Sequence, residues 1–390
     1  MTQGFVADSY QPVADAFDSL FTDGLEDGGS LALYRHGQAV LDLWGGVDPD
    51  DGTPWEKHSV GLGFSTTKGA ATICLLRLAE RGLIDLQAPV ARYWPDFAAE
   101  GKADITVYMV LRHLSALPYL PGPLEQFYEP GRAESSLAAR PTYYPADSTF
   151  IYHAITFGTL VGEIVRRVSG KPIGEFFADE VAGPLGLEFW IGLPEAEEGR
   201  FRRSTYRSFD APPSIPDEAL KQLPADVAAS VRTFQQLAES SMPPSIDSEF
   251  NSRGFRAAAL AGASGANNGR ALARMYAALI GEVDGIRLLS AETVAAAGVL
   301  TTGGVHRPPL PDGTPQPDPR WGIGFHLDDQ FQPMLGEGSF GHTGMGGRLG
   351  FAHPASGIGF GYVSQRMELS MVPQIDERMR RLIAALHESL

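Results

Sequence analysis

The sequence predicts a mixed α/β (α+β) fold, with an antiparallel sheet built from N- and C-terminal strands, helices flanking it, and an inserted, mostly helical lobe. Three observations lead to this prediction. Residues 30–44 form two apolar runs around a Gly-bearing turn, as in a β-hairpin. Residues 321–365 contain short segments rich in Gly, Phe, Val and Tyr, which are typical of consecutive strands. Much of the chain between these regions has apolar residues at helical spacing.

The first helix after the hairpin is predicted over 65–82, STTKGAATICLLRLAERG. Ser65 stands at its start and Gly82 just past its end, as capping chemistry prefers. Helical spacing also predicts helices over 105–117, 151–168, 269–281 and 371–390. Strands are predicted over 321–327, 338–344, 349–353 and 357–365.

The stretch 200–250 is polar, contains several prolines and shows weak periodicity outside 226–239, so we interpret it as a partly helical insertion. We expect a sheet domain made of residues 1–64 together with 255–390. The remaining residues, 65–254, would form a mostly helical domain, in which the insertion contributes to a substrate pocket.

Composition excludes several classes of partner. The chain has 390 residues, with 31 Lys+Arg against 47 Asp+Glu and a net charge of −16, which argues against binding nucleic acid or an anionic membrane. Its single cysteine excludes an internal disulfide framework and a Cys-rich metal site. The nine histidines are scattered without a His-Glu-x-x-His spacing, so we expect no metal and no cofactor.

No apolar run approaches the roughly 20 residues of a membrane span, and the N-terminus lacks a basic start followed by an apolar stretch. The sequence therefore predicts a cytoplasmic protein. Its oligomeric state stays open, with a homo-oligomer as one option.

The motif Ser65-Thr-Thr-Lys68 is the first candidate for chemistry. Residues three apart lie on one helix face, with Cβ atoms about 5–6 Å apart, so Lys68 can reach the Ser65 hydroxyl. A serine becomes a nucleophile when a neighbouring group takes its proton, and an amine does this when burial lowers its pKa. Lys68 has apolar flanks, whereas the other four lysines stand in polar, loop-like contexts: Lys57, Lys102, Lys171 and Lys221.

Two further motifs follow along the chain. Tyr152, in Phe-Ile-Tyr-His-Ala, stands near a loop-to-helix junction from which a hydroxyl can point into a cleft. His342 begins a glycine-rich segment, His-Thr-Gly-Met-Gly-Gly, in which the backbone can approach another group closely. Taken singly, each has an ordinary structural explanation, as a core aromatic and as part of a glycine-rich edge strand.

The order Ser65-Thr-Thr-Lys68, Tyr152-His-Ala, His342-Thr-Gly resembles the three-motif pattern of the serine β-lactamase and penicillin-binding-protein superfamily. The sequence is most similar to the class C β-lactamase-like branch, especially the family VIII carboxylesterases. The resemblance runs from about residue 30 to 366 and is broken mainly by the insertion. It implies a β-lactamase-like fold.

Two departures from the superfamily pattern bear on function. The third motif usually begins with lysine, which helps to bind a substrate carboxylate, and here it begins with His342. The usual Tyr-x-Asn has become Tyr152-His153-Ala154, without the Asn side chain that contacts the acyl-amide group of a lactam. Both changes favour a carboxylesterase that acts on small to medium esters.

The resemblance also implies roles for individual residues. Ser65 would attack the ester carbonyl, with Lys68 and Tyr152 sharing the removal of its proton. The backbone N–H groups of Ser65 and Met345 would form the oxyanion hole. The expected substrate contacts are His342, Gly344, Tyr119 and Phe127.

Other activities stay open on the same nucleophile: a β-lactamase, a D-alanyl-D-alanine peptidase, or an acyltransferase. A binding module without catalysis would normally lack the serine or the lysine, and both are present. A Gly-x-Ser-x-Gly esterase elbow is incomplete here. Ser264, in Gly-Ala-Ser-Gly-Ala, comes close to it but lacks a strong preceding strand, and we interpret it as a decoy.

Overall fold

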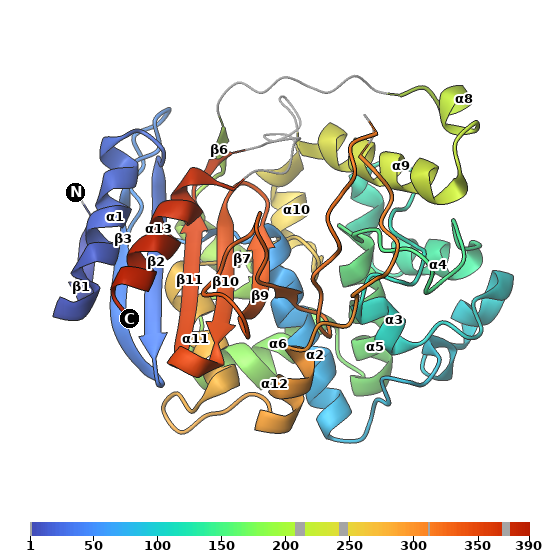
Figure 1. Cartoon of the computed structure of the whole chain (residues 1–390), viewed down its shortest axis with the longest axis horizontal. Helices are drawn as coiled ribbons and strands as arrows, with labels where there is room; N and C mark the ends of the chain where they lie inside the picture. Colours follow the sequence, from blue (N-terminus) through green and yellow to red (C-terminus); the bar gives the residue numbers. More distant parts are fainter. Residues whose placement is uncertain (1, 207–214, 242–248, 311–312, 369–374) are drawn as a thin grey trace.

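The computed structural model describes residues 2–206, 215–241, 249–310, 313–368 and 375–390. A seven-stranded antiparallel sheet has the order β1-β3-β2-β11-β10-β9-β8. Its strands are β1 (Gln3–Val6), β2 (Gly28–Arg35), β3 (Gln38–Gly46), β8 (His326–Leu327), β9 (Phe340–Gly344), β10 (Arg348–His353) and β11 (Ile358–Ser364). The N-terminal β2 pairs with the C-terminal β11, so the two ends of the chain share one sheet, as predicted (Figure 1).

Alternation along β2 separates two hydrophobic cores, because successive side chains of a strand point to opposite faces. Leu31 and Leu33 belong to one buried cluster with residues of α1 (Gln11–Thr22) and α13 (Glu377–Glu388). Ala32 and Tyr34 belong to another, which includes residues of α11 (Gly269–Ile280). The sheet is therefore covered by helices on both faces.

Close packing of α11 on the sheet depends on glycine in β11. A Cβ added at Gly361 would lie 2.1 Å from the carbonyl oxygen of Gly269, the first residue of α11. Only a residue without a side chain allows this approach.

The rest of the chain is mainly helical and lies beside one end of the sheet (Figure 1). Its helices are α2 (Thr67–Glu80), α3 (Val107–Leu111), α4 (Arg132–Ala139), α5 (Thr156–Ser169), α6 (Ile173–Phe177), α7 (Gly183–Leu185), α8 (Asp217–Leu220), α9 (Ala225–Ser241), α10 (Arg253–Ala257) and α12 (Ala291–Ala297). A small sheet has the order β4 (Gly61–Leu62), β7 (Gly265–Asn267) and β5 (Trp190–Ile191), and its strand β4 comes just before α2 in the chain. A further pair joins β6 (Thr205–Tyr206) to β12 (Arg366–Met367). Helix α2 is buried over most of its length, including the polar residues Thr67, Lys68 and Thr72.

Two predicted helix starts are wrong in a way that concerns the site. Helix α2 begins at Thr67, and Ser65 lies in the preceding 3₁₀ turn, Phe64–Thr66, rather than acting as a side-chain cap. Helix α5 begins at Thr156, which leaves Tyr152 in the loop before it. Both residues thus lie just before a helix rather than in its first turn.

Three other boundaries also differ. The helix predicted over 105–117 is only the five residues of α3. The predicted strand 321–327 is reduced to two residues, β8. The final helix begins at Glu377, and residues 371–374 of its predicted start lie outside the described residues.

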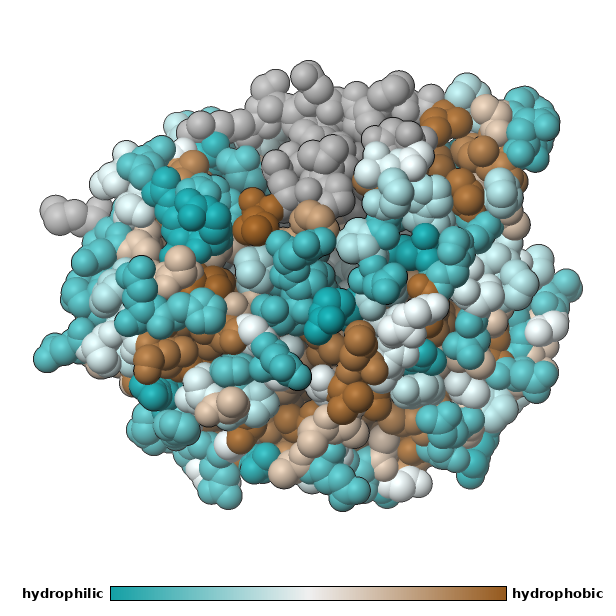
Figure 2. All heavy atoms as spheres, in the orientation of Figure 1, coloured by the Kyte–Doolittle hydropathy of each residue, from teal (hydrophilic) through white to brown (hydrophobic). Residues whose placement is uncertain are grey.

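The face shown in Figure 2 is mostly hydrophilic, with apolar residues in separate patches. Within the described ranges, no helix is long and apolar enough to cross a membrane. The same part of the chain holds no group of three His, Cys, Asp or Glu residues placed to bind a metal ion.

Candidate active site

Ser65 is presented by a sharp turn between β4 and α2. Phe64 has a positive φ of 45°, an uncommon conformation for a bulky residue that must be held by its surroundings. Its carbonyl accepts a hydrogen bond from Thr67 Oγ1 at 2.6 Å, and its ring packs edge-on against Phe250. The N–H of Gly63 donates to Gly265 O at 2.7 Å, which attaches the turn to β7.

Lys68 lies one turn further on, with its side chain fully buried at 0% exposure. Its Nζ lies 3.1 Å from Ser65 Oγ and donates to the carbonyl oxygens of Ala154 and Gly262, both at 2.7 Å. Burial holds the pKa of Lys68 well below its ordinary value of 10.5. A neutral amine has two hydrogens and one lone pair, so with both carbonyls bound its lone pair faces the Ser65 hydroxyl.

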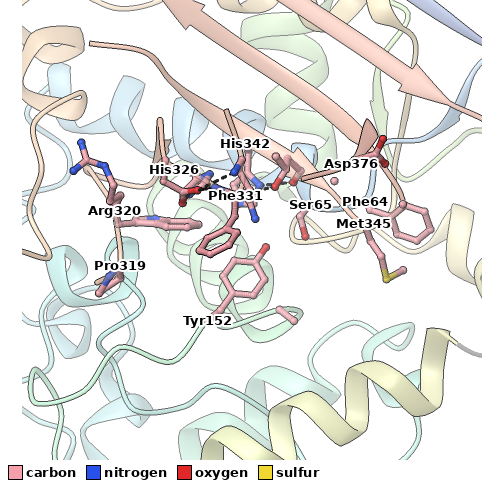
Figure 3. Close-up of a pocket in the computed structure, with 18 of the residues that line it drawn as sticks. Phe64, Ser65, Tyr152, Pro319, Arg320, His326, Phe331, His342, Met345 and Asp376 are labelled. Carbon is pink, nitrogen blue, oxygen red and sulfur yellow. Dashed lines mark hydrogen bonds and ion pairs between the residues drawn. The ribbon is translucent and has the colours of Figure 1, made fainter. Parts of the chain in front are cut away.

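Tyr152 completes the group around Ser65. In Figure 3 its hydroxyl points toward Ser65 from the opposite wall. Lys68 Nζ lies 4.8 Å from the centre of the Tyr152 ring. Burial raises the pKa of Tyr152 above its ordinary value of 10.0, and the neighbouring Ser65 hydroxyl opposes this shift only in part. The phenol is therefore protonated at neutral pH.

The loop that carries Tyr152 is fixed by two buried histidines. The N–H of His153 donates to His113 Nδ1 at 3.0 Å, and His153 Nδ1 donates to Ile151 O at 2.6 Å. His153 Nε2 lies 2.9 Å from Ser115 Oγ. Burial lowers the pKa of both imidazoles, which are neutral hydrogen-bonding groups. His153, the middle residue of the second motif, therefore helps to hold the loop that carries Tyr152.

His342 faces the same space from β9. Its Nδ1 donates to the Thr343 carbonyl at 2.6 Å, and its ring centre lies 6.0 Å from that of Tyr152. Burial holds the pKa of His342 well below 6.5, so the imidazole is neutral. Its Nε2 is buried without a hydrogen-bond partner among the described residues.

The third motif approaches the serine turn closely at Gly344. A Cβ at this position would lie 2.2 Å from Gly63 O, so only glycine lets β9 come this near to the segment before Ser65. Met345 follows directly and lines the same cavity as Ser65.

The cavity has a volume of about 470 Å³, within the usual range for small-molecule sites. In Figure 3, Pro319 and Arg320 lie at one end. Phe64 and Met345 lie at the other end, with Ser65 between the two ends (Figure 3). The site therefore has space on both sides of the serine, as a two-part substrate such as an ester requires.

Three other residues singled out in the sequence lie elsewhere. Tyr119 lines a small adjoining pocket and stacks on Tyr143, with ring centres 4.1 Å apart. Phe127 is packed in the core at 7% exposure and lines neither pocket, so the structure does not bring it to the site. Ser264 is fully buried, and its hydroxyl accepts from Leu260 N at 3.0 Å.

The structure adds groups that the sequence analysis missed. The carbonyls that hold Lys68 belong to Ala154 and Gly262, and a backbone acceptor leaves no signal in the sequence. Trp321 and His326 line the cavity but were interpreted only as part of a strand, and Phe331 lines it from a loop. For these cavity residues, the one hint in the sequence is a run rich in aromatic residues and glycine.

Comparison with known proteins identifies the family. A model of the Beta-lactamase family matches residues 17–385. The esterase/beta-lactamase LipL of Mycobacterium tuberculosis is 36% identical over 369 residues, covering 91% of this chain and 81% of the relative.

Two solved structures are similar over the whole chain. A family VIII carboxylesterase has a TM-score of 0.84 at 33% identity, with 100% of both chains covered. A penicillin-binding protein homolog from Caulobacter crescentus has a TM-score of 0.82 at 29% identity, also with 100% of both chains covered. Since the family model matches nearly the whole sequence, the chain belongs to the Beta-lactamase family.

Proposed function

We propose that this protein is a serine carboxylesterase that hydrolyses small to medium carboxylic esters through a Ser65 acyl-enzyme. The observation that carries the proposal is the buried Lys68 amine, whose Nζ lies 3.1 Å from Ser65 Oγ and 2.7 Å from each of two carbonyl oxygens. The esterase names of LipL and of the family VIII carboxylesterase support it.

The first half of the reaction forms the acyl-enzyme. Lys68 takes the proton from Ser65 Oγ as that oxygen bonds to the ester carbonyl carbon. The negative charge then develops on the carbonyl oxygen, which the backbone N–H groups of Ser65 and Met345 would stabilise. The ester C–O bond breaks, and the leaving alcohol takes the proton from Lys68, directly or through Tyr152.

The second half releases the acid. A water molecule gives a proton to the Lys68–Tyr152 pair as its oxygen attacks the acyl carbon. The bond to Ser65 Oγ breaks, and the serine recovers its proton from the same pair. Burial favours the neutral amine of Lys68 and the neutral phenol of Tyr152, so we assign the general base to Lys68 and the relay to Tyr152.

The alternatives use the same nucleophile. Because the chain is similar to a penicillin-binding protein homolog, β-lactamase and D-alanyl-D-alanine peptidase activities are alternatives. Against them, the third motif carries a neutral His342 in place of a lysine, so it has no fixed positive charge there for a substrate carboxylate. An acyltransferase would differ only in accepting an alcohol instead of water.

Steady-state kinetics with purified variants test the proposal. Ser65→Ala should lower kcat for p-nitrophenyl butyrate by about 10⁴–10⁶-fold, because no other group can form the acyl bond. Ser264→Ala is the matched control and should keep activity, since that hydroxyl is enclosed in the core.

Turnover of nitrocefin should be much slower than that of the butyrate ester. Nitrocefin turnover as fast as ester turnover would instead favour a β-lactamase. Product analysis with an added alcohol would reveal acyl transfer as a second ester, where the proposal expects mainly the free acid.

A further inference from the structure

Arg348 is a buried charged residue that the proposed reaction does not use. It begins β10, and its side chain is fully buried, at 0% exposure. Within the described part of the chain, no carboxylate lies in ion-pair range of its guanidinium. A buried charge without a partner of opposite sign is costly, so its contacts call for a specific explanation.

Arg348 Nη2 donates to Ser204 Oγ at 3.2 Å and to Gln365 O at 3.3 Å. The other two nitrogens join two backbone segments that are far apart in the sequence. Nε donates to Leu62 O at 3.2 Å, and Nη1 donates to Met345 O at 3.0 Å and to Gly346 O at 3.1 Å. Leu62 lies in β4, three residues before Ser65. Met345 is the residue proposed to supply the second oxyanion-hole donor.

The same two segments touch elsewhere around the guanidinium. The Arg348 guanidinium carbon lies 5.1 Å from the centre of the Phe64 ring, in the turn that presents Ser65. Gly344 approaches Gly63 so closely that a Cβ would lie 2.2 Å from its carbonyl oxygen. The relative position of the two segments is thus set by direct packing and by one planar cation.

A second guanidinium, that of Arg378, binds the turn that follows β9. Arg378 Nη2 donates to Gly346 O at 2.8 Å and pairs with Asp376 at 2.7 Å. Arg378 also pairs with the buried Glu26 at 3.2 Å. The Gly346 carbonyl therefore accepts from both arginines, and the turn is fixed to α13 as well as to β4.

We infer that Arg348 is a positioning residue that sets the spacing between the backbone N–H groups of Ser65 and Met345. The inference rests on the proposed function, because these two groups form its oxyanion hole. Arginine suits this task because its donors are held in one rigid plane, so one side chain can bind carbonyls of two segments at once. Lysine carries the same charge on a single flexible nitrogen.

The test compares Arg348→Met with Lys102→Met in the full-length protein. Lys102 is the matched control, because it is also a fully buried cation that donates only to backbone carbonyls, at Ala99, Ala138 and Arg140, away from the cavity. Removing one oxyanion donor costs about 10²–10³-fold in kcat, so Arg348→Met should lose about 10²-fold in kcat with KM little changed.

Affinity for phenylboronic acid, which forms a tetrahedral adduct on a nucleophilic serine, should fall by a similar factor. Lys102→Met should lower Tm while leaving kcat and boronate affinity at their original values. Arg348→Lys keeps the charge without the planar fork and should show an intermediate kcat. If Arg348→Met does not fold, Arg348→Lys carries the same measurements.

Two outcomes would overturn the inference: an Arg348→Met protein that loses stability but keeps kcat and boronate affinity, or full kcat in Arg348→Lys. Failure of the proposed function gives a different pattern. In that case Ser65→Ala retains activity, whatever the Arg348 variants do.

Discussion

Lys68 shows how the environment of one residue sets its chemistry. Its amine is enclosed in the core, and two carbonyls fix its orientation toward Ser65. A solvent-exposed lysine would be protonated at neutral pH and could not take the proton of a serine. Burial thus favours the neutral amine that the proposed role of Lys68 as a base requires.

The pH dependence of turnover follows from this burial. Lys68 must be unprotonated to act, and burial holds its pKa well below 10.5, so kcat/KM should rise with pH through an ionisation well below that value. Burial raises the pKa of Tyr152 above 10.0, so activity should decline only at higher pH, as the phenol ionises. Initial rates with p-nitrophenyl butyrate, corrected for spontaneous hydrolysis, would give this profile.

A histidine could produce a similar acid limb, so His342→Gln is the control. The limb should persist in this variant, because burial keeps His342 neutral. Loss of the limb would assign the ionisation to His342 and contradict the role given to Lys68. The apparent values belong to the coupled Lys68–Tyr152 pair rather than to either residue alone.

The structure places Lys68 beside Ser65, as the sequence predicts, and its catalytic role stays a prediction. Lys68 was selected because its flanks are apolar, while Lys102 was placed among lysines in polar, loop-like contexts. Lys102 does lie in a turn, but it is also fully buried, with its ammonium bound by three carbonyls. The useful signal was the serine one turn before Lys68, since local sequence does not reveal which loop will be enclosed.

Strand β9 and the turn after it act as one element of the site. They bring Gly344 against the segment before Ser65 and place Met345 at the cavity wall. The register of β9 with β10, in which Gly344 pairs with Arg348, fixes where the turn begins. The position of Met345, the proposed second donor of the oxyanion hole, therefore depends on strand pairing.

Gly344→Ala tests this dependence. The new Cβ would lie 2.2 Å from Gly63 O, and relief of that clash must move β9 away from the serine turn. We expect kcat to fall by about 10²-fold, the cost of a displacement of about 1 Å at a catalytic centre. Gly199→Ala is the control, because nothing lies within 4 Å of its added Cβ, and its kcat should be unchanged. Equal kcat values for the two variants would refute the close-approach argument.

Strands and helices were predicted correctly where the pattern of neighbouring residues determines them. The hairpin at 30–44 corresponds to β2 and β3, joined through His36 and Gly37, which both have positive φ as a tight hairpin turn requires. The helix predicted over 105–117 failed because α3 ends at Leu111, and the chain then reaches a left-handed φ of 60° at His113. That conformation accompanies the hydrogen bond from His153, forty residues away, which no local pattern can show.

Over the whole molecule, one hydrophobic cluster crosses from the sheet to the helical part. It includes Ala32 and Tyr34 of β2 together with Leu160 and Ile164 of α5. We propose that residues 1–64 with 255–390 and residues 65–254 are two lobes of one folding unit. The site lies where they meet, with Ser65, Lys68 and Tyr152 from the helical part and His342 and Met345 from the sheet part.

Thermal unfolding should therefore be a single cooperative transition. Circular dichroism in the far-UV, which follows the helices, and in the near-UV, which follows aromatic packing, should give the same midpoint. Two resolved transitions would show that the lobes unfold independently and that the shared core does not couple them.

The most direct test of the whole account is to locate the acyl-enzyme nucleophile. The protein would be labelled with a fluorophosphonate, digested, and the modified peptide mapped by mass spectrometry. The account predicts one adduct per chain, on Ser65, and no adduct in Ser65→Ala. An adduct on Ser264 or any other serine, or ester hydrolysis that persists after full labelling, would contradict it.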